Sequence, residues 1–163
     1  MRPTRDEFVA RYGGVYEHSA WVAKETYATA SGISDTDRLA RLFANCVDDA
    51  SVDRKLELIR AHPDLAGKAS VAGELTEASS EEQSSAGIDQ CTQKEYAEFQ
   101  SLNARYKEKF GFPFVMAVRN SNRREILDAF TKRLNNDQET EFETAITEIH
   151  KIARMRLEAL QKP

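Results

Sequence analysis

Apolar side chains recur at helical spacing along most of the chain. In one stretch they stand three or four residues apart, at Leu39, Leu42, Phe43, Cys46 and Val47. A second stretch repeats the pattern at Tyr96, Phe99, Leu102, Tyr106 and Phe110. This spacing places each set on one face of a helix. Convincing alternation of apolar and polar residues is absent, so the pattern predicts helices and no sheet.

Polar residues and glycines mark the expected ends of these helices. Thr4 with Glu7, and Thr92 with Glu95, have the spacing of a capping box, which opens a helix. The other helix starts are expected at Ser19, within 34–37, at Ser51, at Asn122 and near Gln138. The expected stops are the glycines at 13–14, 32 and 111, together with Pro63 and, for the last helix, Leu160.

Two segments depart from this pattern. Residues 67–90 contain three glycines and five serines, and they are expected to form the longest loop, with one short helix from Ser79 or Ser80. The apolar run from Val115 to Val118 is too short for periodicity to distinguish a strand from a buried helix. Repeats and linker-like segments are absent from the sequence. Residues 1–163 are therefore expected to form a single all-α domain, a bundle of about eight helices.

Composition narrows the class of protein. Of the 163 residues, 40% are apolar and 31% are charged, which is the balance of a globular protein with its own core. A net charge of −4 argues against binding to nucleic acid or to an anionic membrane surface, and no apolar run is long enough to span a membrane. Cys46 and Cys91 lack the spacing of a zinc or disulfide motif, and the first residues do not resemble a secretion signal. A reduced, cytoplasmic protein is therefore expected.

His62 is the first candidate for chemistry. Histidine titrates near neutral pH, and Pro63 disfavours helix at the residue before it, so His62 is expected at a helix boundary. The residue alone favours the simpler interpretation, a histidine that satisfies backbone carbonyls at a helix end. His18 and His150 are weaker candidates. Three histidines at these spacings do not form a metal-binding pattern.

Two further segments offer polar groups to a ligand. The stretch from Ser79 to Gln83 combines hydroxyls, carboxylates and a carboxamide, which suits a ligand rich in amides, although an ordinary acidic helix start is common. Arg119 follows an apolar segment, and it is either a solvated arginine or one that binds a carboxylate. Arg156 lies on an apolar stripe, where snorkelling explains it more simply. Lys68 could form a Schiff base only if buried, and a lysine beside glycine is more often exposed.

Taken together and in order, these segments resemble the OHCU decarboxylase family, the 2-oxo-4-hydroxy-4-carboxy-5-ureidoimidazoline decarboxylases of urate degradation. The most specific segments are His62-Pro63-Asp64-Leu65-Ala66-Gly67-Lys68 and Lys109-Phe110-Gly111-Phe112-Pro113-Phe114-Val115. The likeness covers nearly the whole chain, from Glu7-Phe8-Val9 to Arg156-Leu157. It departs at Ala20, where many members have proline, and at Asn120, where many have glycine.

This resemblance implies an all-α fold and a carboxy-lyase that converts its substrate to (S)-allantoin without a cofactor or a metal. It also implies that His62 and Glu82 are catalytic. The substrate-binding residues that it implies are Pro63, Ser79, Gln83, Val115, Met116, Ala117, Val118 and Arg119. The resemblance leaves open how His62 and Glu82 share the proton transfers. It also leaves open whether Arg119 binds the departing carboxylate or the ring oxygens.

The expected partner is a small anionic substrate, and the resemblance also allows a homodimer, which the composition does not demand. Two other interpretations stay open at this point. One is a hydrolase or lyase that acts on a related ureido compound in the same pocket. The other is a non-catalytic helical interaction module, whose sign would be an exposed apolar patch. The apolar positions of this chain fall into core stripes, so no such patch is obvious.

Overall fold

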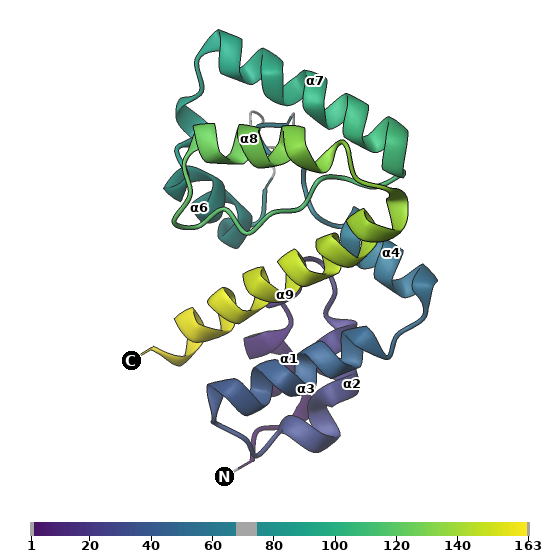
Figure 1. The fold of residues 1–163 in the computed structure, drawn as a ribbon. Coiled ribbons are helices and arrows are strands. Elements are labelled where there is room, and N and C mark those ends of the chain that lie inside the picture. The colour runs from purple at the N-terminus through teal and green to yellow at the C-terminus, as the bar shows by residue number, and fades with distance from the viewer. Residues whose placement is uncertain (1, 68–74, 163) are drawn as a thin grey trace. The chain divides into compact units, whose positions relative to one another are not determined.

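The structure is a computed structural model that describes residues 2–67 and 75–162. In these ranges every regular element is a helix (Figure 1). The α-helices are α1 (Arg5–Tyr12), α2 (Trp21–Ala30), α3 (Thr36–Asp48), α4 (Val52–Arg60), α6 (Glu77–Ser85), α7 (Gln93–Phe110), α8 (Arg123–Arg133) and α9 (Gln138–Gln161). A short 3-10 helix, η1 (Ile88–Gln90), stands between α6 and α7. These eight α-helices confirm the prediction of an all-α protein. Lys68 and part of the predicted 67–90 loop lie outside the described residues.

The chain divides into two compact units. Unit 1 comprises Met1–Ala61 and Ile149–Pro163, and unit 2 comprises His62–Glu148. Helix α9 contributes residues to both, because the division falls between Glu148 and Ile149. All the site residues implied by the resemblance belong to unit 2. The contacts within unit 2 are therefore described in more detail below.

The sequence signals at most helix starts are confirmed. Thr4 and Thr92 form complete capping boxes, in which hydrogen bonds run in both directions to Glu7 and Glu95. Helices α3, α4 and α8 are capped by the side chains of Asp35, Ser51 and Asn122. These caps need only residues three positions apart, which is why the sequence alone reveals them.

Two predicted helix starts are wrong. The hydroxyl of Ser19 donates a hydrogen bond of 2.8 Å to a backbone carbonyl two residues earlier, and α2 begins without a side-chain cap. Helix α6 is capped by Thr76 and therefore begins before the predicted start at Ser79 or Ser80. In the first case a local bond between side chain and backbone competes with the cap, as serine hydroxyls often do.

Unit 1 contains an aromatic core and a buried ion pair. Helix α2 packs against α1 and α3, and the ring centroids of Phe8, Tyr12 and Phe43 lie 4.9–6.2 Å apart. Nη2 of Arg156 lies 3.1 Å from Oε2 of Glu17, and their side chains are 8% and 2% exposed. Snorkelling is therefore the wrong interpretation of Arg156, because a buried carboxylate neutralises its charge and the head group does not reach water.

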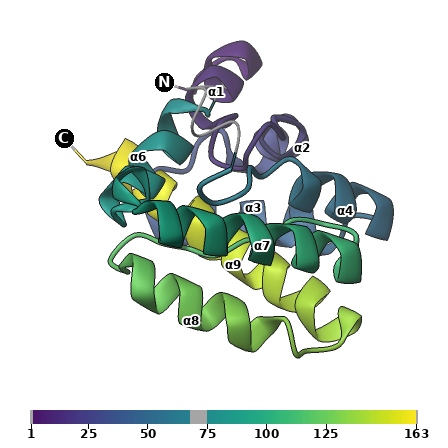
Figure 2. The same cartoon turned by 90° about the horizontal axis from the view of Figure 1, so that it is seen from above.

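Unit 2 is built around the ring of Tyr106. Helix α7, which carries this tyrosine, packs against α8 (Figure 2). The rings whose centroids lie 4.5–6.0 Å from that of Tyr106 are Phe110, Phe112, Phe114 and Phe130. Phe114 also stacks on Phe130, with centroids 3.8 Å apart. The aromatic run that follows α7 thus turns the chain back onto the helix it has just left.

The apolar run from Val115 to Val118 is neither a strand nor a helix. Nη1 of Arg133 donates to the Val115 carbonyl at 2.7 Å, and the Ala117 amide donates to Oε1 of Glu148 at 3.1 Å. Side chains from α8 and α9 thus satisfy backbone groups that a regular element would pair. Periodicity gave no answer for this run because its conformation depends on these distant partners.

We expect the free energy of unfolding to fall above pH about 10, where tyrosines of the unfolded chain ionise. Burial raises the pKa of Tyr106, and its hydrogen bond to the Glu141 carboxylate raises it further. Burial also raises the pKa of Tyr16, and the charge of Asp48 adds to this shift. The folded state therefore keeps protons that the unfolded state loses, and folding is disfavoured as the pH rises.

Urea titrations between pH about 8 and pH about 11 measure this loss of stability. The Tyr106→Phe variant should lose less of its free energy of unfolding than the parent over this range. The half-buried Tyr96 provides a matched control, because Tyr96→Phe leaves the buried tyrosines in place. Identical losses in the parent and in Tyr106→Phe would contradict the expectation.

Candidate active site

His62 lies directly after helix α4, as the signal from Pro63 predicts. Helix α4 ends at Arg60, the chain turns at Ala61, and Pro63 has no amide hydrogen with which to continue the helix. His62 is 7% exposed. The structure therefore holds a buried imidazole at the start of unit 2.

Helix α7 holds the segment that follows His62. Nε2 of Gln100 donates to the Ala66 carbonyl at 2.6 Å, and Nδ2 of Asn103 donates to the Leu65 carbonyl at 2.9 Å. One turn further along α7, Nζ of Lys107 contacts Oδ2 of Asp64 at 2.6 Å. These three contacts attach the segment 64–66 to one face of α7.

Helix α6 holds the same segment through Gln83. The Ala66 amide donates to Oε1 of Gln83 at 3.1 Å, and Nε2 of Gln83 donates to the Asp64 carbonyl at 3.3 Å. Gln83 is itself buried. The structure therefore brings the two clusters predicted from the sequence, around His62 and around Ser79 to Gln83, into neighbouring positions in unit 2.

Side chains of α6 differ in how far they are exposed. Ser79 and Gln83, one turn apart, are buried, and Glu82 is half-buried. Their spacing of three and four residues places all three on adjoining parts of one helix surface. A hydroxyl, a carboxylate and a carboxamide thus lie along the part of α6 that is tied to the segment after His62.

The stretch from Val115 to Arg119 is held by different partners. Val115 and Val118 are buried, Met116 and Ala117 are half-buried, and Arg119 is exposed. The Val115 carbonyl and the Ala117 amide are already hydrogen-bonded to side chains of unit 2. That Arg119 converges with His62 and Glu82 on one ligand stays a prediction.

Asn103 is a site candidate that the sequence analysis missed. It is 4% exposed, and its Oδ1 is a buried side-chain acceptor for which the described residues provide no hydrogen-bond partner. A buried acceptor of this kind is available to a donor on a ligand. The sequence held a signal, because Asn103 lies four residues after Phe99 and three before Tyr106, where a polar residue interrupts an apolar stripe.

His150, another titratable candidate, belongs to unit 1 and not to the unit that contains these clusters. In unit 1, Nδ1 of His150 lies 2.8 Å from the Tyr16 hydroxyl, and its Nε2 lies 2.9 Å from Oδ1 of Asp48. In the part of the chain that the structure describes, no group of three or more histidine, cysteine or acidic side chains is placed to hold a metal ion. In the same ranges, no helix has both the length and the apolar character needed to cross a bilayer.

A hollow in unit 1 does not coincide with the predicted site. It has a volume of about 360 Å³ and is lined by side chains of α3 and α9, among them Phe43, Ala153 and Leu157. Arg154 and Asp37, which form an ion pair, also line it. None of the catalytic or substrate-binding residues that the resemblance implies lines this hollow. The chemistry predicted from the sequence therefore belongs to unit 2, around His62 and α6.

Comparison with known proteins identifies relatives along the whole chain. The family model described as OHCU decarboxylase matches residues 2–158. The 2-oxo-4-hydroxy-4-carboxy-5-ureidoimidazoline decarboxylase of Halalkalicoccus jeotgali is 44% identical over 159 residues, which cover 98% of this chain and 88% of that protein.

Two solved structures share the fold. The crystal structure of an (S)-allantoin synthase matches with a TM-score of 0.77 and 35% identity, over 97% of this chain and 51% of that one, so this chain corresponds to about half of that protein. The crystal structure of an OHCU decarboxylase in the presence of (S)-allantoin matches with a TM-score of 0.74 and 25% identity, over 92% of this chain and 96% of that one.

Proposed function

The chain belongs to the OHCU decarboxylase family, and on this basis we propose that it converts 2-oxo-4-hydroxy-4-carboxy-5-ureidoimidazoline to (S)-allantoin and CO2 as a carboxy-lyase of urate degradation. The observation that supports this proposal best is the pair of hydrogen bonds between the Gln83 side chain and the backbone of Asp64 and Ala66. These bonds tie the helix that carries Glu82 to the segment that begins at His62. A buried imidazole and a carboxylate on these two elements suit one small ligand.

The chemistry of the substrate defines what the protein must supply. Loss of CO2 leaves an electron pair on carbon, and many enzymes borrow pyridoxal phosphate or thiamine to accept it. This substrate carries its own conjugated imine, which accepts the pair as the bond to the carboxylate breaks. The hydroxyl then loses its proton to become the ring carbonyl, the ring nitrogen that accepted the pair takes up one proton, and a second proton is added at the carbon that bears the ureido group. The protein must therefore orient the ring, place charge and deliver one proton to one face.

In this proposal the two catalytic side chains have distinct roles. Glu82 accepts a hydrogen bond from the substrate hydroxyl and orients the ring. His62 assists the departure of the carboxylate and then helps to deliver the proton that sets the (S) configuration. General acid–base assistance of this kind contributes typically ~10²–10⁴-fold to a rate.

The remaining polar groups would bind the amides of the substrate. After its two bonds to the backbone, the Gln83 carboxamide keeps one N–H and one lone pair, and Ser79 offers a hydroxyl. Oδ1 of Asn103, for which the described residues provide no partner, suits an N–H of the ureido group or the ring. Pro63 would line the site beside His62.

The stretch from Val115 to Arg119 would complete the site. Because the Val115 carbonyl and the Ala117 amide are already bonded, we assign the substrate contacts to the side chains of this stretch and to the backbone of Met116. Arg119 would offset the negative charge of the substrate. A carboxylate that leaves as neutral CO2 should sit away from the tightest cation, so we assign the ring oxygens to Arg119.

The substrate is a small molecule, and its carboxylate makes it an anion at neutral pH in this proposal. We also expect the protein to form a homodimer and to work in the cytoplasm. Sedimentation equilibrium of the full chain tests the first of these. A mass of one chain at micromolar concentration would exclude a stable dimer.

The direct test supplies the substrate from urate, by oxidation and ring hydrolysis in the same cuvette. We expect the protein to speed the release of CO2 and the appearance of the circular dichroism signal of (S)-allantoin. Release of ammonia without CO2 would instead identify a hydrolase of a related ureido compound. If CO2 release and product chirality match those of a protein-free sample, the proposal is wrong.

A further inference from the structure

Three polar side chains of α7 contact the segment after His62 in reverse order. Along α7, Gln100, Asn103 and Lys107 contact Ala66, Leu65 and Asp64 respectively. We call these three side chains the α7 ladder. Their spacing of three and four residues places them on one face of the helix, so each advance along the segment is matched by about one turn of α7.

The ladder holds a conformation that the segment does not favour by itself. Ala66 has φ of 52°, in the left-handed region where a β-carbon is crowded. Next to it, a β-carbon at Gly67 would lie only 2.7 Å from that of Asp64. Such backbone conformations persist only where surrounding contacts determine them. Here the contacts come from the α7 ladder on one helix and from Gln83 on another.

We propose that the α7 ladder is the positioning device of the His62 imidazole, an inference that rests on the proposed function. Only Pro63 separates His62 from the first held residue, Asp64, and the ring of proline restricts the backbone at that link. Little freedom therefore remains between the anchored segment and the imidazole. Displacement of a catalytic group by about 1 Å is enough to cost on the order of 10²-fold in rate.

Each contact of the α7 ladder with the segment is one rung. The rung between Lys107 and Asp64 allows an effect on positioning to be distinguished from an effect on stability. Its side chains are 47% and 25% exposed, and exposed ion pairs contribute little to the free energy of unfolding. It is nevertheless the rung that stands nearest to His62 along the chain. A positioning role therefore predicts that the loss of this rung changes activity far more than stability.

The experiment is done in the full chain. It compares substitutions that remove a contact of the α7 ladder with substitutions that keep it. Lys107→Met and Gln100→Leu remove a donor, whereas Lys107→Arg and Gln100→Lys keep one. We expect the first pair to lower kcat about 10-fold each, with KM changed less than about threefold, and to reduce the enantiomeric excess of the allantoin formed. The second pair should recover most of kcat. Asn103→Leu should have the largest effect, since it breaks the buried contact with Leu65 and also removes the acceptor proposed to bind the substrate.

Two controls keep the result interpretable. Leu127→Ala on α8 removes buried side-chain volume at a residue outside the ladder, and it should destabilise the protein while its kcat and enantiomeric excess stay at the parental values. His62→Ala, measured in the same assay, tests the proposed function separately. If His62→Ala is inactive while Lys107→Met and Gln100→Leu keep the parental kcat and enantiomeric excess, the ladder has no positioning role. If His62→Ala is fully active, the proposed site itself is wrong.

Discussion

Replacement of His62 by alanine is expected to lower kcat by ~10²–10⁴-fold, the usual contribution of a side chain that moves a proton in the rate-limiting step. The allantoin that still forms should be nearly racemic. Without the imidazole, water protonates either face of the ring carbon equally. Circular dichroism at constant substrate supply, together with the rate of CO2 release, measures both quantities in one experiment.

Controls must separate chemistry from folding, because His62 is buried. His62→Gln keeps a polar side chain of similar length, and its helical content and urea midpoint should stay close to those of the parent. Glu82→Gln keeps the shape of a half-buried side chain but removes its charge, and it should lower kcat with less effect on chirality. A His62→Ala protein that works as fast and as stereospecifically as the parent would refute the assignment of His62.

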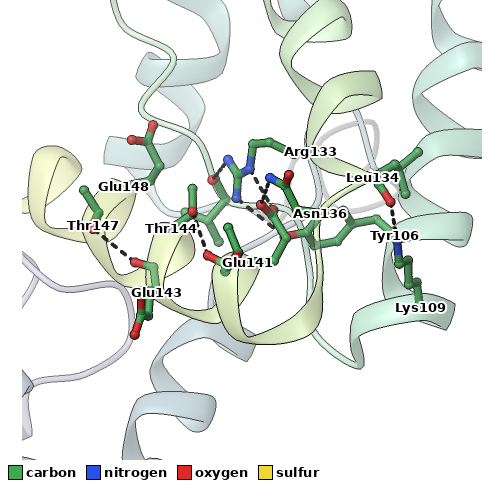
Figure 3. A network of polar contacts seen from close by, with 12 residues as sticks. Tyr106, Lys109, Arg133, Leu134, Asn136, Glu141, Glu143, Thr144, Thr147 and Glu148 are labelled. Atoms are coloured by element: carbon green, nitrogen blue, oxygen red, sulfur yellow. Dashed lines mark hydrogen bonds and ion pairs between the residues drawn. The ribbon is translucent and has the colours of Figure 1, made fainter.

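The largest loss of stability is expected from breaking the buried ion pair between Arg133 and Glu141. Figure 3 shows three side chains that converge on Glu141, which is fully buried. Nε of Arg133 lies 2.8 Å from Oε1, the Tyr106 hydroxyl donates to the same oxygen at 2.6 Å, and Nδ2 of Asn136 donates to Oε2 at 2.9 Å. Glu141→Leu leaves the guanidinium without its counter-charge, and it should lower the free energy of unfolding by about 3–5 kcal/mol.

Urea denaturation of matched variants tests this expectation. Asp128→Asn breaks an ion pair between Arg124 and Asp128 in the same unit, and it should cost less than about 1 kcal/mol because both side chains are exposed. The double variant Arg133→Met/Glu141→Leu should recover only part of the loss, since it leaves the Val115 carbonyl without the donor that Arg133 provides. Equal losses for Glu141→Leu and Asp128→Asn would contradict the importance of the buried network.

How far the fold follows from the sequence depends on the range of each interaction. Thr4 and Thr92 cap helices through residues three positions away, so a short stretch of sequence reveals them. Arg156 was misinterpreted because its partner Glu17 stands 139 residues earlier, and periodicity reports only which face a residue occupies. The irregular run after Phe114 escaped prediction for the same reason, since Arg133 and Glu148 hold its backbone.

The candidate site likewise contains residues that a short stretch of sequence reveals and residues that only the folded chain reveals. His62 stands out locally, because Pro63 marks the helix boundary and the imidazole is a chemically distinctive group. The resemblance to a known family then added Glu82, which by itself is one of many acidic residues near a helix start. Asn103 was missed because its significance lies in a contact with Leu65, 38 positions earlier, and in an acceptor that finds no partner within residues 2–67 and 75–162. Neither property is visible before the chain is folded.

The contact between Arg133 and Val115 has a practical consequence for engineering. Exchanging a buried ion pair for apolar residues often makes a protein more heat-resistant. Here the same guanidinium also holds the backbone of a stretch proposed to face the substrate. The exchange would leave the Val115 carbonyl without its donor, so a library designed for heat resistance should keep Arg133 and Glu141 unchanged and vary other positions.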